Sequence, residues 1–262
     1  MRKTNTGTNA ESSTSRRQLL ERVGATAATG AVVGLAGCLS SLDTGDCNGH
    51  SIEPEAALEG ADLADCDLSG ADLSMATLTD ATLRGATLRE ADLFLADLEG
   101  ADLREADLTD AAFLASSIAD ADVRGATLTG ADLSGAALRG KAFPDVTLAD
   151  ATLVETDLEE ADLSDAELSN ADLTSVNLVA ADLSGADLSN ADLTDAILEA
   201  TDLSGADLTG ADLTDAYPID ADFTDADLSG ATWIDGSACE TADCGDGPSR
   251  VGTASLSGFG NR

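Results

Sequence analysis

The sequence predicts an all-β solenoid, in which the chain turns one corner every five residues and stacks coil upon coil. A five-residue period runs from Ala56 to Asp235 without an insertion, which gives 36 units in 180 residues. Leu fills 29 of the 36 central positions, and Ala fills 29 of the 36 positions two residues earlier. Aromatic residues make up only 3% of the chain, so its core must be built from Leu and Ala.

Neither an α-helix nor a flat strand buries this period on one side. Five residues advance a helix by about 140° beyond a full turn, so the leucines would spread over every face. In a strand, a step of five sends successive leucines to opposite faces. A corner in every unit instead directs each Leu towards one axis, and Gly, Asp, Asn and Ser suit such corners. Stacked coils can then pair their backbone N–H and C=O groups in ladders about 4.8 Å apart.

The repeated unit, Ala-Asp-Leu-Ser/Thr followed by Gly, Asp or Asn, resembles the consensus of the pentapeptide repeat family. The resemblance covers residues 56–235. It implies a right-handed quadrilateral β-helix with four units in each coil, hence about nine coils and a rod of about 43 Å. Residues twenty apart would then stack in one column.

The N-terminal 37 residues predict an export signal. The motif S-R-R-Q-L-L at residues 15–20 precedes an apolar run at 23–36, which is too short to span about 30 Å of hydrocarbon as a helix. This order resembles a twin-arginine signal, which implies that Arg16 and Arg17 are read by the export machinery. The L-A-G-C sequence that ends at Cys38 resembles a lipobox, which implies cleavage before Cys38 and a lipid on its thiol. A chance arginine pair and a free cysteine are the alternatives.

These motifs divide the chain into four expected segments and place the mature protein outside the cell. The segments are a signal peptide (1–37), a lipidated N-terminus and tether (38–55), a pentapeptide-repeat β-helix (56–235), and a C-terminal tail or cap (236–262). We expect a protein anchored by lipid to the extracellular face of the cell membrane. The net charge of the whole chain, −37, suits molar salt, where the Debye length falls to about 3 Å. A twin-arginine lipoprotein with this charge looks haloarchaeal.

The charge also bounds the partners. Nucleic acid binding requires a basic footprint, which a chain with 50 acidic and 13 basic residues lacks. Residues 56–235 carry 41 acidic and 6 basic side chains, about 0.8 negative charge per Å of rod against about 0.6 in duplex DNA. Some pentapeptide-repeat proteins imitate DNA and occupy the DNA site of gyrase. DNA mimicry towards such an enzyme is therefore one interpretation, although the export signal argues against it.

Catalytic chemistry is absent from the repeat sequence. The single histidine, His50, precedes the repeats, so no histidine can act as a general base within them. There is no phosphate-binding glycine loop and no calcium-binding repeat. The stacked carboxylates are typical of a solvated face, with weak cation binding as the alternative. We therefore predict a non-enzymatic protein without cofactor or metal, which acts as a rigid acidic scaffold or binding module for a protein partner or for itself.

Four cysteines beyond Cys38 are candidates for disulfides in an extracellular setting. Cys66 takes an inward Ala position in the first coil, and Cys239 and Cys244 follow the repeats. Bonds between Cys47 and Cys66 and between Cys239 and Cys244 would clamp the two ends of the rod. The segment 47–50 could otherwise be half of a metal site.

Outward positions carry two apolar groups on an otherwise acidic surface. The first group comprises Met75, Phe94, Leu95, Leu114, Ala115 and Val154. The second comprises Val179, Ala180, Ile197, Tyr217 and Ile219. Apolar residues that stack within one or two columns are candidates for partner binding or self-association. A column of Arg84, Arg104 and Arg124 lies among carboxylates and predicts ion pairs across coils.

Lys141 breaks the pattern because it occupies an inward Ala position. A buried lysine without a partner is costly enough to lose its proton or move. Pro144 also removes one backbone donor nearby. We predict a local distortion at residues 140–146 that lets the ammonium reach water, with Asp145 as a neighbour, while the flanking coils stay in register. The distortion is either a tolerated irregularity or a recognition feature.

Overall fold

The computed structural model describes residues 46–118, 120–143 and 146–239. The chain divides into two units, residues 1–35 and 36–262, and every described residue belongs to the second. Arg16, Arg17, Cys38 and Cys244 lie outside the described residues, so the predicted export signal and lipid anchor remain predictions. Within the described ranges, no helix is long and apolar enough to cross a membrane.

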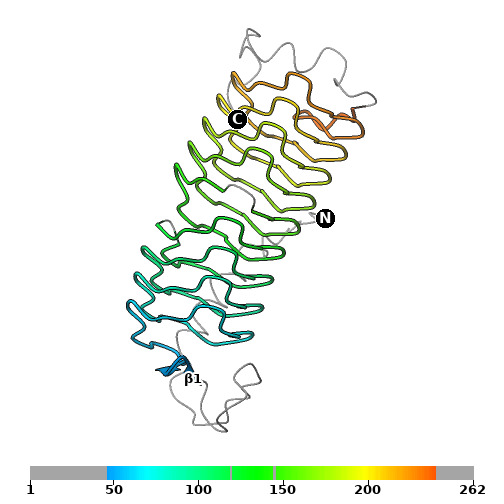
Figure 1. Cartoon of the computed structure of the whole chain (residues 1–262). Helices are drawn as coiled ribbons and strands as arrows, with labels where there is room; N and C mark the ends of the chain where they lie inside the picture. Colours follow the sequence, from blue (N-terminus) through cyan, green and yellow to red (C-terminus); the bar gives the residue numbers. More distant parts are fainter. Residues whose placement is uncertain (1–45, 119, 144–145, 240–262) are drawn as a thin grey trace, which may run out of the picture. The chain divides into compact units, whose positions relative to one another are not determined.

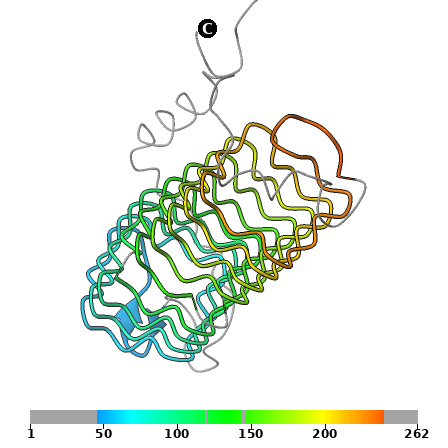
Figure 2. The ribbon, with the colours of Figure 1, turned by 90° about the horizontal axis from the view of Figure 1, so that it is seen from above.

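The repeat region forms a stack of coils, which confirms the predicted solenoid (Figure 1). Among the described residues, 30 parallel bridges each join two residues twenty apart, from Ala57 with Thr77 to Asp212 with Thr232. Twenty residues are four pentapeptide units, so each unit sits directly on the unit four places earlier. Figure 2 shows these coils lying one behind another.

Backbone hydrogen bonds hold each unit to its own corner and to the neighbouring coils. The Ala61 N–H donates to the Leu58 C=O at 3.0 Å and closes a β-turn. The Leu58 N–H donates to the Thr77 C=O at 2.8 Å, and the Thr77 N–H donates to the Ala56 C=O at 2.9 Å. The last residue of the unit adds a third bond between coils. Four of the five backbone donors of a regular unit are thereby satisfied.

Where Asp precedes the central Leu, its side chain satisfies the fifth backbone donor of the unit. In one unit, the Ser74 N–H donates to Asp72 Oδ1 at 3.1 Å, and the Ser74 hydroxyl donates to the same oxygen at 2.6 Å. The same bond recurs through the stack, for example from the Thr224 N–H to Asp222 at 2.9 Å. An Asp side chain that accepts from the backbone two residues later is an Asx-turn. The Asp-Leu-Ser/Thr sequence therefore completes the backbone bonding of the corners in which it occurs.

The last residue has a left-handed backbone in 33 units, with φ of 64° at Gly60 and 76° at Gly230. This conformation favours Gly, Asp and Asn, which dominate the position. Met75 and Leu95 adopt the same conformation with φ of 58° and 56°, although neither residue type favours it.

The core is a column of leucines edged by alanines. All 36 central residues are buried, and 31 of the 36 residues at the Ala positions are buried as well. Two threonines at Ala positions bury their hydroxyls without loss, because Thr156 donates to the Leu133 C=O at 3.0 Å and Thr201 donates to the Leu178 C=O at 2.8 Å. Buried apolar surface and extensive backbone pairing together stabilise the stack.

A small hairpin precedes the first coil. Strand β1 (Asp46–Cys47) pairs antiparallel with strand β2 (His50–Ser51). Asn48 and Gly49 have φ of 50° and 86°, as the Asn-Gly pair of a type I′ turn requires. A disulfide joins Cys47 to Cys66 of the first coil. The described residues contain no group of three side chains that could hold a metal ion.

The last coil is closed by a different device. The chain folds back so that Thr232 pairs antiparallel with Ala238. The Trp233 ring packs edge-on against Phe223, with ring centroids 5.5 Å apart, and both residues are buried. Pro218 occupies a central position in this coil, where its missing N–H removes a donor that a further coil would need. The end of the stack is thus poorly suited to adding another coil.

Candidate functional surfaces and the Lys141 junction

Charge is distributed unevenly along the stack. All six basic residues of the repeat region lie between Arg84 and Lys141. From 146 to 235 the chain carries 23 acidic residues and no basic residue. Ten of the parallel bridges place two carboxylates opposite each other, and eight of these ten lie beyond residue 160. Repulsion between like charges is therefore concentrated in the C-terminal half.

The five arginines of the repeat region all form ion pairs. Arg84 reaches Glu105 of the next coil at 2.5 Å, and Arg89 reaches Asp107 at 3.2 Å. Arg139 pairs with Glu159 at 2.6 Å. Arg139 also reaches Glu160 at 3.4 Å. The remaining pairs, all within the predicted arginine column, are Arg104 with Asp102 and Asp122, and Arg124 with Asp122. These side chains are 36–59% exposed, so each pair contributes little to stability.

Asp122 is the carboxylate most strongly affected by these pairs. The Arg124 guanidinium donates to both of its oxygens, at 2.8 Å from Nε to Oδ1 and 2.5 Å from Nη2 to Oδ2. These hydrogen bonds lower the pKa of Asp122 to about 2, against the weaker opposing effect of burial. A hydrogen bond from Arg104 likewise lowers the pKa of Asp102.

The first apolar group is continuous over three coils. Met75 and Leu95 are 47% and 45% exposed, and the Met75 N–H donates to the Phe94 C=O in the next coil at 2.8 Å. The Leu95 N–H donates to the Leu114 C=O at 3.2 Å. Ser134 and Gly135 occupy the equivalent positions of the following coil, so Val154 is separated from this group. Phe94, Leu114 and Val154 are half-buried.

The second apolar group centres on Tyr217. Ile197 and Tyr217 pair directly in neighbouring coils and are 41% and 54% exposed. Ile219 is 39% exposed and lies two residues after Tyr217. Side chains two residues apart across a central residue are neighbours, as the Ser74–Asp72 hydrogen bond demonstrates. Glu199 separates the half-buried Val179 from Ile219 in their column, so the exposed apolar surface consists of Ile197, Tyr217 and Ile219.

The ladder opens on two faces beside Lys141. The expected pairings of Ser117 with Ala137 and of Asp122 with Ala142 are absent from the part of the chain that the structure describes. Pairing towards the following coil is intact, as Ala142 pairs with Asp162. The Lys141 N–H keeps its turn bond to the Leu138 C=O at 3.1 Å.

The register remains twenty on both sides of this opening, as predicted. The distortion differs from the predicted bulge within 140–146, because it separates the Lys141 coil from the preceding one and reaches residues 117–123. Residues 144–145 lie outside the described residues.

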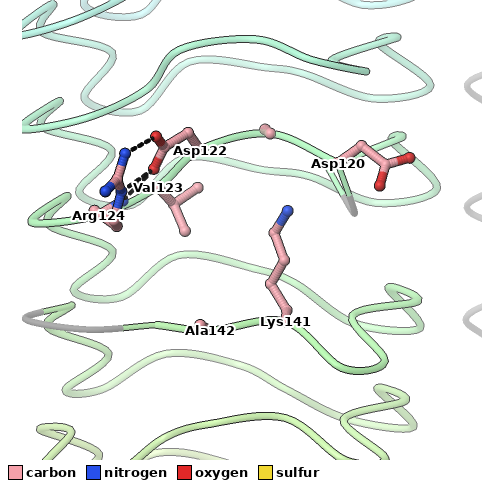
Figure 3. Close-up of a pocket in the computed structure, with 7 residues that line it drawn as sticks. Asp120, Asp122, Val123, Arg124, Lys141 and Ala142 are labelled. Atoms are coloured by element: carbon pink, nitrogen blue, oxygen red, sulfur yellow. Dashed lines mark hydrogen bonds and ion pairs between the residues drawn. The ribbon is translucent and has the colours of Figure 1, made fainter.

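The opening forms a cavity of about 290 Å³ lined by residues 120–124, 141 and 142. In Figure 3 the half-buried Lys141 side chain extends from its own coil towards the preceding one, between Asp120 and Asp122. Burial lowers the pKa of Lys141, and the charges of Asp120 and Asp122 oppose this shift. Lys141 forms no ion pair with any residue that the structure describes, in contrast to the five arginines.

Sequence reasoning identified Lys141 but missed the residues that face it. A column step of twenty places Lys141 beside Ala121, so residues 120–123 could have been named from the spacing alone. Ser116 belongs to the same opening. Its hydroxyl oxygen is buried and is the one buried side-chain polar atom without a hydrogen bond in the described ranges. Unlike Thr156 and Thr201, it finds no carbonyl acceptor.

Cys239 is disulfide-bonded, and its N–H donates to the Ala231 C=O at 2.7 Å. Its sulfur partner lies outside the described residues. The Cys47–Cys66 bond holds the hairpin to the first coil. The Cys47–Cys66 bond therefore secures the N-terminal end of the stack.

Coils of four five-residue units, most of them with an inward Leu, define a β-solenoid repeat protein. A family model described as pentapeptide repeats matches in eight copies, over residues 55–85, 75–110, 115–140, 143–179, 177–215 and 201–232. The chain belongs to the pentapeptide repeat family, which is generally non-catalytic. No curated protein matches the sequence.

Solved structures of the same family resemble the chain. HetL, a pentapeptide repeat protein involved in heterocyst differentiation regulation in the cyanobacterium Nostoc, is 32% identical over 71% of this chain and 92% of its own, with a TM-score of 0.35. Rfr23 from the cyanobacterium Cyanothece is 25% identical over 42% and 89%, with a TM-score of 0.40. The plasmid-mediated fluoroquinolone resistance protein QnrB1 is 20% identical over 65% and 88%, with a TM-score of 0.43. These TM-scores are low, so the family assignment rests on the repeat sequences.

Proposed function

We propose that this protein is a non-enzymatic scaffold or binding module, anchored by lipid at Cys38 to the extracellular face of the membrane. Its repeats form about nine coils of a right-handed quadrilateral β-helix that presents a protein-binding surface. It uses no cofactor and binds no nucleic acid. The acidic composition fits a haloarchaeal source, where molar salt screens the carboxylates.

The exposed group of Ile197, Tyr217 and Ile219 supports the binding role. Tyrosine is enriched among the residues that dominate binding energy at protein interfaces. The group lies on coils without any basic residue, within a segment, 146–235, that carries 23 acidic residues. A surface that only needed to remain soluble would have no reason to stack Ile on Tyr.

Photocrosslinking in intact cells tests the binding role. A photoreactive phenylalanine analogue replaces Tyr217, and the matched control replaces Asp222, which is exposed in the same coil. We expect a discrete crosslinked species from position 217 and none from position 222. Equal crosslinking from both positions, or from neither, would contradict a binding surface at Tyr217.

Cell fractionation tests the anchor separately. Cys38→Ser should release the protein from membranes into the medium or block its processing. Arg16→Lys together with Arg17→Lys should retain precursor inside the cell. Unchanged membrane association and processing of the Cys38→Ser variant would exclude the lipid anchor.

The acidic half of the stack supports one alternative, a DNA mimic that binds a DNA-processing enzyme such as gyrase. Residues 146–235 carry 23 negative charges over about 22 Å, a higher linear density than the ~0.6 per Å of duplex DNA. This function requires a cytoplasmic pool of the protein. A purified chain that leaves DNA supercoiling by gyrase unchanged, together with complete export, would exclude it.

A further inference from the structure

The opening beside Lys141 leaves four backbone groups facing one cavity without partners. In a regular coil, the Val123 N–H would donate to the Ala142 C=O, and the Ala142 N–H would donate to the Ala121 C=O. Neither bond forms, and these groups have no other partner among the residues that the structure describes. Ala121, Val123 and Ala142 all line the cavity of about 290 Å³. Such groups favour water or a ligand that carries its own hydrogen-bonding atoms.

Lys141 supplies an amine to the same cavity. Its side chain points into the opening between Asp120 and Asp122 (Figure 3). Asp122 is already engaged by Arg124, and Asp162 of the following coil accepts from Ser164. Because burial lowers the pKa of Lys141, a larger fraction of its side chain is the neutral amine than in an exposed lysine. A neutral amine is the form that attacks electrophilic carbon.

The lining charges indicate which ligand this amine meets. Two carboxylates, Asp120 and Asp122, face two cations, Arg124 and Lys141, so the lining favours neither anions nor cations. The groups left over are hydrogen-bond donors and acceptors of the backbone together with an amine nucleophile. A small neutral carbonyl compound complements this set, because its oxygen can accept from the Val123 or Ala142 N–H.

We propose that the Lys141 junction binds small aldehydes and that Lys141 Nζ captures them as an imine. The nitrogen lone pair forms a C–N bond to the carbonyl carbon, and the C=O π electrons move to the oxygen. The nitrogen then loses its two protons, the oxygen leaves as water, and a C=N bond remains. No electrons are gained or lost overall. This activity is separate from the proposed partner surface at Tyr217.

Competitive labelling within one chain tests the proposal. The full chain with Arg139→Lys is treated with propanal and cyanoborohydride, which reduces the imine to a stable amine, and each lysine is quantified by peptide mass spectrometry. Position 139 is in the same coil, and its side chain is 53% exposed. At pH 7.5 we expect Lys141 to react faster than the introduced lysine by on the order of threefold or more, with the ratio falling as pH approaches about 10.4.

Two further measurements separate a site from an accessible amine. The Lys141 rate should saturate with propanal concentration, whereas the rate at position 139 should stay linear. Asp120→Asn removes a charge that favours the ammonium, so it should increase the Lys141 rate at pH 7.5. Lys141→Ala should abolish the assigned label, and circular dichroism establishes that each variant is folded. Lys141 reactivity equal to or below that at position 139, a linear dependence, or no increase in Asp120→Asn would overturn the proposal.

Discussion

Replacing Lys141 with Ala should stabilise the protein, although it removes a half-buried side chain. The substitution restores the residue found at 29 of 36 equivalent positions. It allows Ser117–Ala137 and Asp122–Ala142 to pair as the other coils do, which would add four backbone hydrogen bonds. At about 0.5–1.5 kcal/mol each the maximum gain is about 2–6 kcal/mol, and we expect about 1–3 because these groups are now partly solvated.

The matched control is Ala161→Lys, which places a lysine one coil later in the same column. Ala161 is 1% exposed, and the bonds on either side of it are regular. This variant should open a closed ladder and lower the free energy of unfolding by about 1–3 kcal/mol or more. Urea unfolding followed by circular dichroism measures both changes. A destabilised Lys141→Ala protein would refute the explanation that Lys141 holds the coils apart.

Three other changes in stability are expected. The thermal midpoint should rise as salt increases from about 0.1 M to molar levels, because screening weakens the carboxylate repulsion. Amide hydrogen exchange should slow most beyond residue 160, where the paired carboxylates are concentrated. A flat or falling midpoint would show that repulsion does not limit stability. The pKa of Asp122 is about 2 when folded, below its usual value, so its contribution is present above about pH 4 and lost as pH falls towards 2. Asp122→Asn should therefore flatten the decline of the urea midpoint over that range, and an unchanged slope would contradict this. The double variant Cys47→Ala with Cys66→Ala should lower the free energy of unfolding by about 2–4 kcal/mol, because it removes a disulfide that links residues 19 apart. At position 66 the substitution restores the Ala of the regular repeat. An unchanged free energy of unfolding would show that the disulfide does not stabilise this end of the stack.

Several structural details could have been read from the sequence with local rules alone. Asn48-Gly49 is the strongest short hairpin signal, and it explains a segment that otherwise suggested half of a metal site. Asp two residues before Ser or Thr is an Asx-turn signal. Both features depend on contacts within a few residues, so neither requires knowledge of the coil.

The five-residue period by itself determined the fold class, the inward leucines and the spacing of the columns. It did so because every unit repeats the same local geometry. One buried residue in every five fits a chain that turns a corner in each unit, and it fits neither a helix nor a flat strand. The same spacing placed Ile197 on Tyr217, a contact that the structure retains.

Only the tertiary structure decided how the coils respond where the pattern fails. The sequence marks Lys141 as misplaced, but it does not state whether the chain bulges or the ladder opens. The outcome depends on the competition between burying an ammonium and breaking hydrogen bonds to two neighbouring coils. Here the bonds to the following coil persist and those to the preceding coil break, because the Lys141 side chain extends towards Asp120 and Asp122. That choice involves residues twenty positions apart, which meet only once the coils are stacked.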